Sequence, residues 1–151
     1  MSNSSRTTYV GTAPFLTAAG ARTVLDAALA EAVRMGVPQC VAVVDSGGHL
    51  LAFGRVDGAR VGSVSIAQTK AISAATRKRP TGDEGGGDPM ITIRLALAAD
   101  RVTGIAGGLP IVVDGVVVGG VGVSSGTSDQ DLQCAQAGLA ALAAGVGTTA
   151  Q

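Results

Sequence analysis

Three side chains in this 151-residue chain have the chemistry of a small-molecule site. His49 is the only histidine, and because an imidazole gains and loses a proton near neutral pH, it is the candidate general acid or base. Lys70 and Arg77 are seven residues apart on one predicted helix face, so both could hold a carboxylate or polarise an enolate. Plainer interpretations stay open: a hydrogen-bonded turn histidine, and a lysine whose stem lies along the helix surface.

Other patterns point to an anionic or flat ligand. A basic run over 77–79 ends a predicted helix just before a glycine-rich loop over 81–89, which would suit a small anion. The segment VVGGVGVSSG could form the floor under a flat ligand, or it could let a helix or a second subunit cross a sheet closely. Asp129 and Asp131 are expected to be favourable charges in the first turn of the last helix. A single histidine and no zinc-like cysteine spacing predict no metal site.

The elements that must position these residues follow from the apolar pattern. Apolar residues at steps of three and four predict a helix over 17–35, and helix-permissive composition and end signals predict further helices over 59–77, 90–99 and 127–144. Two β-hairpins are predicted, one turning at 46–48 and the other at Asp114-Gly115, a favoured type I′ pair. Thr127 or Ser128 is expected to cap the last helix. This order predicts an α+β fold, with an antiparallel sheet and helices packed on it.

Composition narrows the functional classes. The chain length fits a single domain, for which we expect a loose leader over 1–15, a folded domain over 16–145 and a flexible tail over 146–151. Net charge is zero, which argues against nucleic acid and anionic membrane surfaces as partners. Only 15% of residues are charged and mean hydropathy is +0.41, so a homo-oligomer is expected. No hydrophobic leader or membrane span is apparent, which predicts a cytoplasmic protein with Cys40 and Cys134 reduced and buried.

Three segments together resemble a known family. They are AVVDSGGHLLAFGRVDGA (42–59), QTKAISAATRKRPT (68–81) and GGLPIVVDGVVVGGVGVSSGTSDQDLQCAQAGLAAL (107–142). This text is similar to the GlcG/HbpS family, also called the haem-degrading-domain or DUF336 family and related to the C-terminal domain of PduO proteins. The resemblance implies a profilin-like domain with a sheet of about five antiparallel strands, assembled into dimers, tetramers or octamers. Ligand-binding residues are expected within the matching segments, at Asp57, Arg79, Gly107, Gly108, Leu109 and Ser124.

Three functions are compatible with these observations. Because some members of the family bind haem, the first is a small-ligand-binding protein for haem or another planar, anionic ligand. The second is a cofactor-independent isomerase, hydratase or lyase acting on a small oxygenated carboxylic acid or ketone, with His49 as acid or base and Lys70 and Arg77 as anion anchors. The third is a structural or regulatory oligomer without a ligand.

Overall fold

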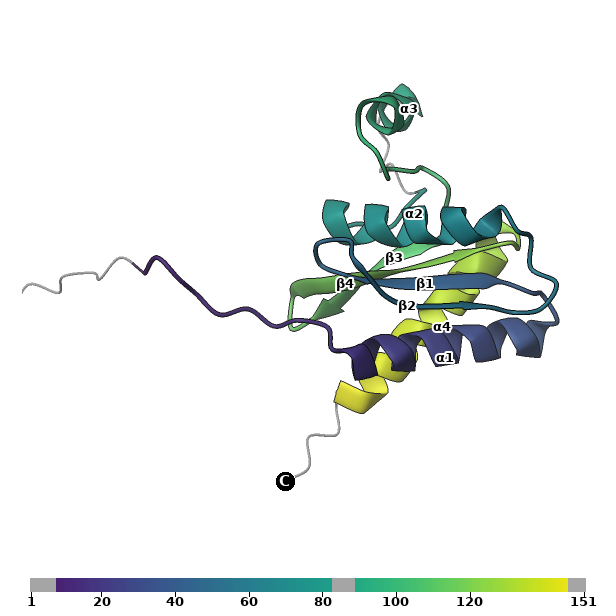
Figure 1. Ribbon diagram of the computed structural model, residues 1–151, viewed down its shortest axis with the longest axis horizontal. Coiled ribbons are helices and arrows are strands. Elements are labelled where there is room, and N and C mark those ends of the chain that lie inside the picture. Colours follow the sequence, from purple (N-terminus) through teal and green to yellow (C-terminus); the bar gives the residue numbers. More distant parts are fainter. Residues whose placement is uncertain (1–7, 83–88, 147–151) are drawn as a thin grey trace, which may run out of the picture.

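Eight elements make up the fold. The computed structural model describes residues 8–82 and 89–146, so most of the glycine-rich loop over 81–89, including Gly85–Gly87, lies outside the described residues (Figure 1). The elements in chain order are α1 (Ala18–Met35), β1 (Cys40–Asp45), β2 (Leu50–Arg55), α2 (Ser63–Arg77), α3 (Pro89–Ala98), β3 (Gly108–Val113), β4 (Val116–Ser124) and α4 (Ser128–Val146). The α+β prediction is therefore confirmed, whereas the predicted boundaries of the leader and the tail stay predictions.

The sheet is antiparallel throughout and has the strand order β2-β1-β4-β3. It contains four strands within the described residues, not the expected five or so. Each hairpin supplies two strands, and the described chain between the hairpins forms α2 and α3, which leaves no segment there for a fifth. In the second hairpin, Asp114 and Gly115 both have positive φ (50° and 77°), as the predicted two-residue turn requires.

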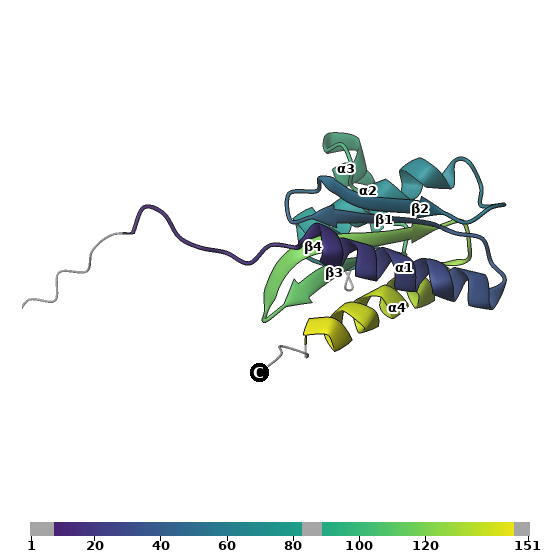
Figure 2. The same ribbon diagram turned by 60° about the horizontal axis from the view of Figure 1, so that its bottom comes forward.

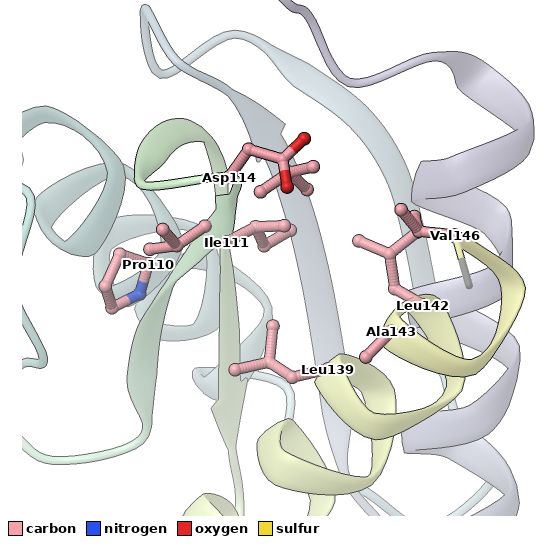
Figure 3. A pocket seen from close by; sticks show the side chains of 9 residues that line it. Pro110, Ile111, Asp114, Leu139, Leu142, Ala143 and Val146 are labelled. Carbon is pink, nitrogen blue, oxygen red and sulfur yellow. The ribbon is translucent and has the colours of Figure 1, made fainter.

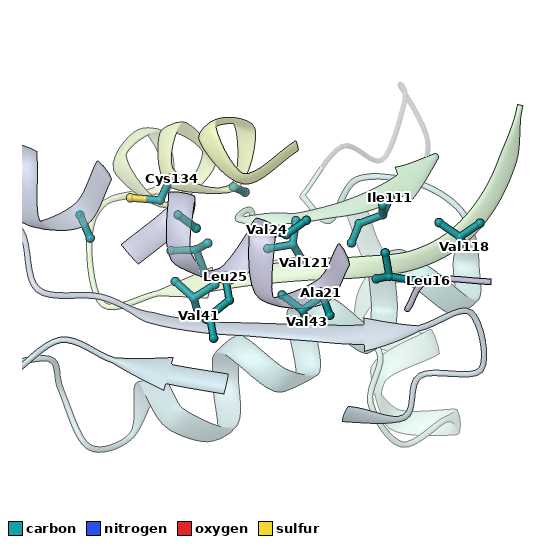
Figure 4. Close-up of a cluster of buried hydrophobic side chains, with 14 residues drawn as sticks. Leu16, Ala21, Val24, Leu25, Val41, Val43, Ile111, Val118, Val121 and Cys134 are labelled. Atoms are coloured by element: carbon teal, nitrogen blue, oxygen red, sulfur yellow. The ribbon is translucent and has the colours of Figure 1, made fainter. Parts of the chain in front are cut away.

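Helices cover both faces of the sheet. Helices α1 and α4 pack on one face and α2 packs on the other, while α3 stands beyond α2 (Figures 1 and 2). Because side chains alternate along a strand, Val41 and Val43 of β1 join the core under α1 and α4 (Figure 4). Ala42 and Val44 join the smaller core under α2. None of the helices in the described ranges is long and apolar enough to cross a membrane.

Glycines on β4 let α2 lie directly on the backbone of the sheet. A Cβ atom added at Gly120 would overlap the carbonyl oxygen of Ala71, and one added at Gly122 would overlap that of Ala67. This contact confirms the interpretation of VVGGVGVSSG as a close helix crossing. It also rules out Gly120 and Gly122 as an open floor for a flat ligand, since α2 covers that face of β4.

Candidate functional site

A cavity of about 350 Å³ opens where the N-terminal ends of α2 and α4 meet. Its lining is mostly polar or glycine: Arg60, Gly62, Ser63, Lys70, Ser124, Ser125, Gly126, Ser128 and Asp131, with Ile66 and Ile105 as the apolar members. Helices α2 and α4 begin at Ser63 and Ser128 in this lining, so the positive ends of two helix dipoles face the same space.

A buried ion pair lies in the wall of this cavity. The Nζ atom of Lys70 donates to Oδ2 of Asp131 at 2.8 Å and to the carbonyl oxygen of Val123 at 2.7 Å. The other carboxylate oxygen of Asp131 accepts from the backbone N–H of Gly126 at 3.0 Å. The Lys70 and Asp131 side chains are only 1% and 5% exposed. The ammonium and the carboxylate neutralise each other, so their pair adds no net charge to the cavity.

Glycines make room for this lysine. Gly107 has φ +121°, and a Cβ atom there would lie 2.9 Å from the Nζ atom of Lys70. A Cβ atom at Gly108 would lie 2.9 Å from the carbonyl carbon of Lys70. Both glycines are buried and do not line the cavity. Gly107 leaves room for the end of the Lys70 side chain, whereas Gly108 lets the backbone of α2 at Lys70 approach β3 closely.

Hydroxyl groups complete the polar wall. Ser124 on β4 and Ser63 at the start of α2 lie 3.3 Å apart through their Oγ atoms. The Ser125 hydroxyl accepts from the backbone N–H of Arg60 at 3.0 Å, which ties the segment before α2 to the end of β4. Each of these hydroxyls keeps further donor or acceptor capacity that a ligand oxygen could use.

A buried amide borders the same site. The Gln39 side chain is fully buried, and neither Nε2 nor Oε1 has a hydrogen-bond partner among the described residues. A Cβ atom at Gly126, which lines the cavity, would lie 2.5 Å from that Nε2 atom. A buried unsatisfied amide costs roughly 1–3 kcal/mol, so a polar group reaching it from the Gly126 side would be stabilised.

The first helix turn of α4 explains the shape of this end of the site. Thr127 Oγ1 accepts from the backbone N–H of Gln130, and Gln130 Oε1 accepts from the backbone N–H of Thr127. This reciprocal capping box confirms Thr127 as the predicted cap. It fixes the point at which α4 begins, and with it the position of Asp131 one turn later.

His49 lies at the other end of the sheet. Asp45, which precedes its turn, pairs with Gly119, whereas the carbonyl group that binds Lys70 belongs to Val123, which pairs with Val41. Four residues of strand separate these points, about 13 Å along β1. The structure therefore does not bring His49 and Lys70 to one site within a chain.

The His49 side chain itself is open to solvent. It is 82% exposed, and its Nδ1 atom lies 3.2 Å from Oδ1 of Asp45. The backbone N–H of His49 also donates to Asp45, and together with the N–H of Gly47 it holds the pKa of that carboxyl below its ordinary value. This is the geometry of a hydrogen-bonded turn histidine with an accessible ring.

The other predicted site residues are scattered. Only Lys70 and Ser124 line the cavity between α2 and α4. Arg77 is half-buried at the far end of α2, about 10 Å along the helix from Lys70, and Arg79 follows it. Leu109 packs on the larger core, and Asp57 is exposed in the loop after β2. Lys70 and Arg77 thus do not point into one groove, because Lys70 reaches across to α4.

The sequence reasoning missed most of the site. Asp131 was expected to be a helix-end charge, but it is the buried partner of Lys70. One signal was available: Asp131 begins the buried stripe of α4 that continues at Cys134, Ala135 and Gly138. Arg60 lies in the segment just before α2 and belongs to no motif, so nothing in the sequence distinguished it.

A second, apolar cavity of about 670 Å³ lies between β3 and the C-terminal half of α4 (Figure 3). Leu139, Leu142 and Val146 point into it from the helix, and Asp114 is its one charged lining residue. Neither cavity is lined by histidine, cysteine, methionine or tyrosine. Among the described residues, no three metal-ligand side chains gather at one place.

Comparisons with known proteins agree with the fold. The chain is 38% identical to Protein GlcG of Escherichia coli over 105 residues, which is 69% of this chain and 77% of that protein. The Klebsiella pneumoniae protein ORFY, a DUF336 protein, superimposes with a TM-score of 0.83 at 31% identity, covering 93% of this chain and 99% of ORFY. The PduOC protein in a PduOC–haem complex gives 0.76 at 27% identity, covering 85% and 95%.

A family model described as haem-degrading protein, HbpS-like, matches residues 16–140. That range contains all four strands, together with the cavity between α2 and α4. The chain therefore belongs to the HbpS-like family, as its sequence motifs indicated.

Proposed function

We propose that the protein binds a small anionic ligand, one bearing a carboxylate or a similar oxyanion, in the cavity between α2 and α4. The observation that carries this proposal is the convergence of two helix N-termini and the Arg60 side chain on one polar space. Helix N-termini favour anions through their dipoles, and arginine adds a bidentate donor. Since Lys70 is neutralised by Asp131, Arg60 supplies the net positive charge.

The size of the cavity limits the ligand. A volume of about 350 Å³ is near the lower end of the range for ligand pockets. Ser63, Ser124 and Ser125 add hydroxyls that can bond to ligand oxygens, and Ile66 with Ile105 gives the mouth an apolar side. These features favour a small oxygenated acid with a short apolar part.

Haem is the second candidate ligand, because the similar PduOC protein forms a haem complex. Haem iron is usually held by histidine, cysteine, methionine or tyrosine, and no such residue lines either cavity. Within a single subunit, the residues that line the two cavities therefore do not supply an axial ligand for haem iron. His49 is 82% exposed and could reach an iron only on the outer surface.

The geometry favours binding over the proposed acid–base reaction. That reaction needs a proton-transferring side chain beside the anion site, and His49 lies about 13 Å along β1 from it. The Lys70 ammonium is already bonded to Asp131 and Val123. The residues that remain in the cavity are suited to hold an anion.

Calorimetric titration tests the proposal with four probes: acetate, lactate, succinate and inorganic phosphate. We expect saturable binding of at least one probe at one site per chain. Arg60→Gln should weaken it by about 10- to 100-fold, the cost of one charge-assisted contact. Arg22→Gln, an exposed arginine on α1, is the matched control and should change nothing. No saturable heat with any probe, or equal affinity for Arg60→Gln, would refute the proposal.

A parallel hemin titration decides the second candidate. A saturable change in the absorbance of hemin that is lost in His49→Ala would assign haem to the outer surface at His49. A flat titration, or one unaffected by His49→Ala, would remove that assignment. Because His49 lies away from the α2–α4 cavity, this result is independent of the carboxylate titration.

A further inference from the structure

The segment before α1 extends from the body of the protein as an arm. Residues 8–17 form no helix or strand, and they leave the body beside the β3–β4 turn and the C-terminal end of α4 (Figures 1 and 2). Tyr9 is 92% exposed, Val10 82% and Phe15 79%, although no charged residue occurs from 7 to 17. Clustered apolar side chains that face water in this way mark a surface that another molecule covers.

The apolar cavity between β3 and α4 begins at the root of this arm. A smaller cavity of about 220 Å³ is bordered by Pro14 and Phe15, and it shares Val113, Leu142 and Val146 with the larger cavity. The two cavities are thus neighbours with shared walls, and together they make up the β3–α4 groove. It borders β3, the last strand of the sheet, whose outer edge pairs with no strand among the described residues.

The arm does not turn back into the groove of its own chain. Its path runs away from the body (Figures 1 and 2), and Pro14 helps to keep it extended, since proline fixes its own φ and confines the preceding residue to extended conformations. Residues 8–14 can span at most about 25 Å, so the arm can reach a neighbouring body. The arm and the groove are thus both apolar, but within one chain the arm does not lie in the groove.

We propose that two copies of this chain exchange arms, the arm of each copy lying in the β3–α4 groove of the other. Tyr9 and Val10 then contact the Leu139 and Leu142 side of the groove, and the extended backbone runs beside the free edge of β3. Such an exchange is isologous: the same two surfaces meet twice around a two-fold axis. In each copy, the point where the arm leaves the body lies next to that copy's own groove. The two arms can therefore cross near the two-fold axis, as this symmetry requires.

Charge and area support a second copy as the occupant. The arm carries no charge and the groove has only Asp114, so no like charges oppose each other. Two exposed aromatic side chains bury about 150–250 Å² each, so two arms and the groove surfaces they cover give roughly 1,200–2,000 Å², the size of a stable interface. The scarcity of charged residues, 15% of the chain, also fits a body that buries surface against a copy of itself.

Tyrosine fluorescence reports directly on the arm. Tyr9 is the only tyrosine and the chain has no tryptophan, so all the long-wavelength emission comes from this segment. Three valine-to-aspartate variants form a matched set: Val10→Asp in the arm, Val112→Asp in the groove wall, and Val33→Asp on α1 as the control. Val33 and Val112 are 65% and 51% exposed, so neither change places a charge in the core.

Iodide quenching of Tyr9 and light scattering after size exclusion are measured on the full chain. We expect a wild-type dimer or larger assembly in which Tyr9 is quenched several-fold less than N-acetyltyrosinamide. Val10→Asp and Val112→Asp should each release subunits and raise quenching to the free value, whereas Val33→Asp should match the wild type.

Three outcomes would overturn the exchange. They are free-like quenching in the wild type, an assembly unchanged in Val10→Asp, and loss of assembly in Val10→Asp with none in Val112→Asp. The last result would place the arm outside the groove. If circular dichroism shows that Val112→Asp does not fold, Ala143→Glu on the exposed helical side of the groove replaces it.

Discussion

Replacing Lys70 with methionine should strongly destabilise the protein. Methionine keeps the apolar stem but removes the ammonium, which leaves the Asp131 carboxylate and the Val123 carbonyl without their shared donor. Both side chains are at most 5% exposed, so solvent screens the remaining charge only weakly. Breaking a buried pair on one side costs about 3–5 kcal/mol, because the remaining charge is buried alone.

Thermal and urea unfolding at one fixed protein concentration measure this cost, since subunit association would otherwise shift the result. A loss of this size lowers Tm by about 6–20 °C for a domain of this length. Lys78→Met, which alters the exposed lysine after α2, is the matched control and should stay within about 0.5 kcal/mol of the wild type.

A second substitution separates the buried charge from the lost packing. Asp131→Asn retains an oxygen that can accept from Gly126, but it removes the negative charge. Added to Lys70→Met, it should recover about 1–3 kcal/mol, a coupling typical of residues in contact. The reasoning would be refuted if Lys70→Met cost less than about 1 kcal/mol, or if the two changes were simply additive.

Three further predictions concern other parts of the molecule. Gly122→Ala should lower the free energy of unfolding in urea by about 1–3 kcal/mol or more, because its Cβ would overlap the backbone of α2. Gly62→Ala, where an added Cβ meets nothing within 4 Å, should leave that free energy nearly unchanged. Equal effects of the two changes would contradict the close crossing. The hydrogen bond from Arg34, with that from Gln133, lowers the pKa of Glu31 to about 2, so the stability from this contact is present above the ordinary value of 4.5 and is lost as pH falls toward 2. In NMR titrations Arg34→Ala should raise that pKa toward 4.5, and an unchanged value would exclude Arg34 as its cause. Burial raises the pKa of Cys134 to about 11, so a disulfide reagent at pH 8 should label this thiol only when the protein unfolds. For the same reason the stability of the fold should fall as pH rises from 9.0 to about 11. Rapid labelling of the folded protein would show that the thiol is accessible.

The fold could be predicted from the sequence because its signals are local. The first helix was expected over 17–35 and is found over Ala18–Met35, with the Thr17 hydroxyl accepting from Gly20. The Asp114-Gly115 turn needs positive φ at both positions, a requirement that these residue types meet. The start of α2 was placed four residues early, since residues 59–62 have a helix-permissive composition but form turns stabilised by contacts such as Arg60 to Ser125.

The candidate site could not be predicted in the same way, because it depends on contacts between distant residues. Lys70 and Asp131 are 61 positions apart, and neither neighbourhood indicates that the two side chains meet. The sequence singled out Lys70 as a lysine in a helix of small and apolar residues, and Ser124 through the family resemblance; both line the cavity, while their roles in binding stay predictions. Arg60, another lining residue, is in an irregular segment, where no periodicity indicates the direction of a side chain.

The backbone contact between α2 and β4 adjoins the candidate cavity, since Lys70 takes part in both. Its spacing is set by Gly120 and Gly122, by the main-chain atoms of α2 above them, and by the Cβ atoms of Ala75 and Lys70 that face them. The exposed lining residues Arg60 and Ser128 make none of these contacts, so we expect that they can be exchanged without moving the wall behind them. A library randomised at the mouth alone should yield folded proteins with altered ligand preference, whereas randomising the glycines should yield mostly unfolded chains. For protein engineering, the α2–β4 contact would be kept constant while the exposed residues that line the cavity are varied.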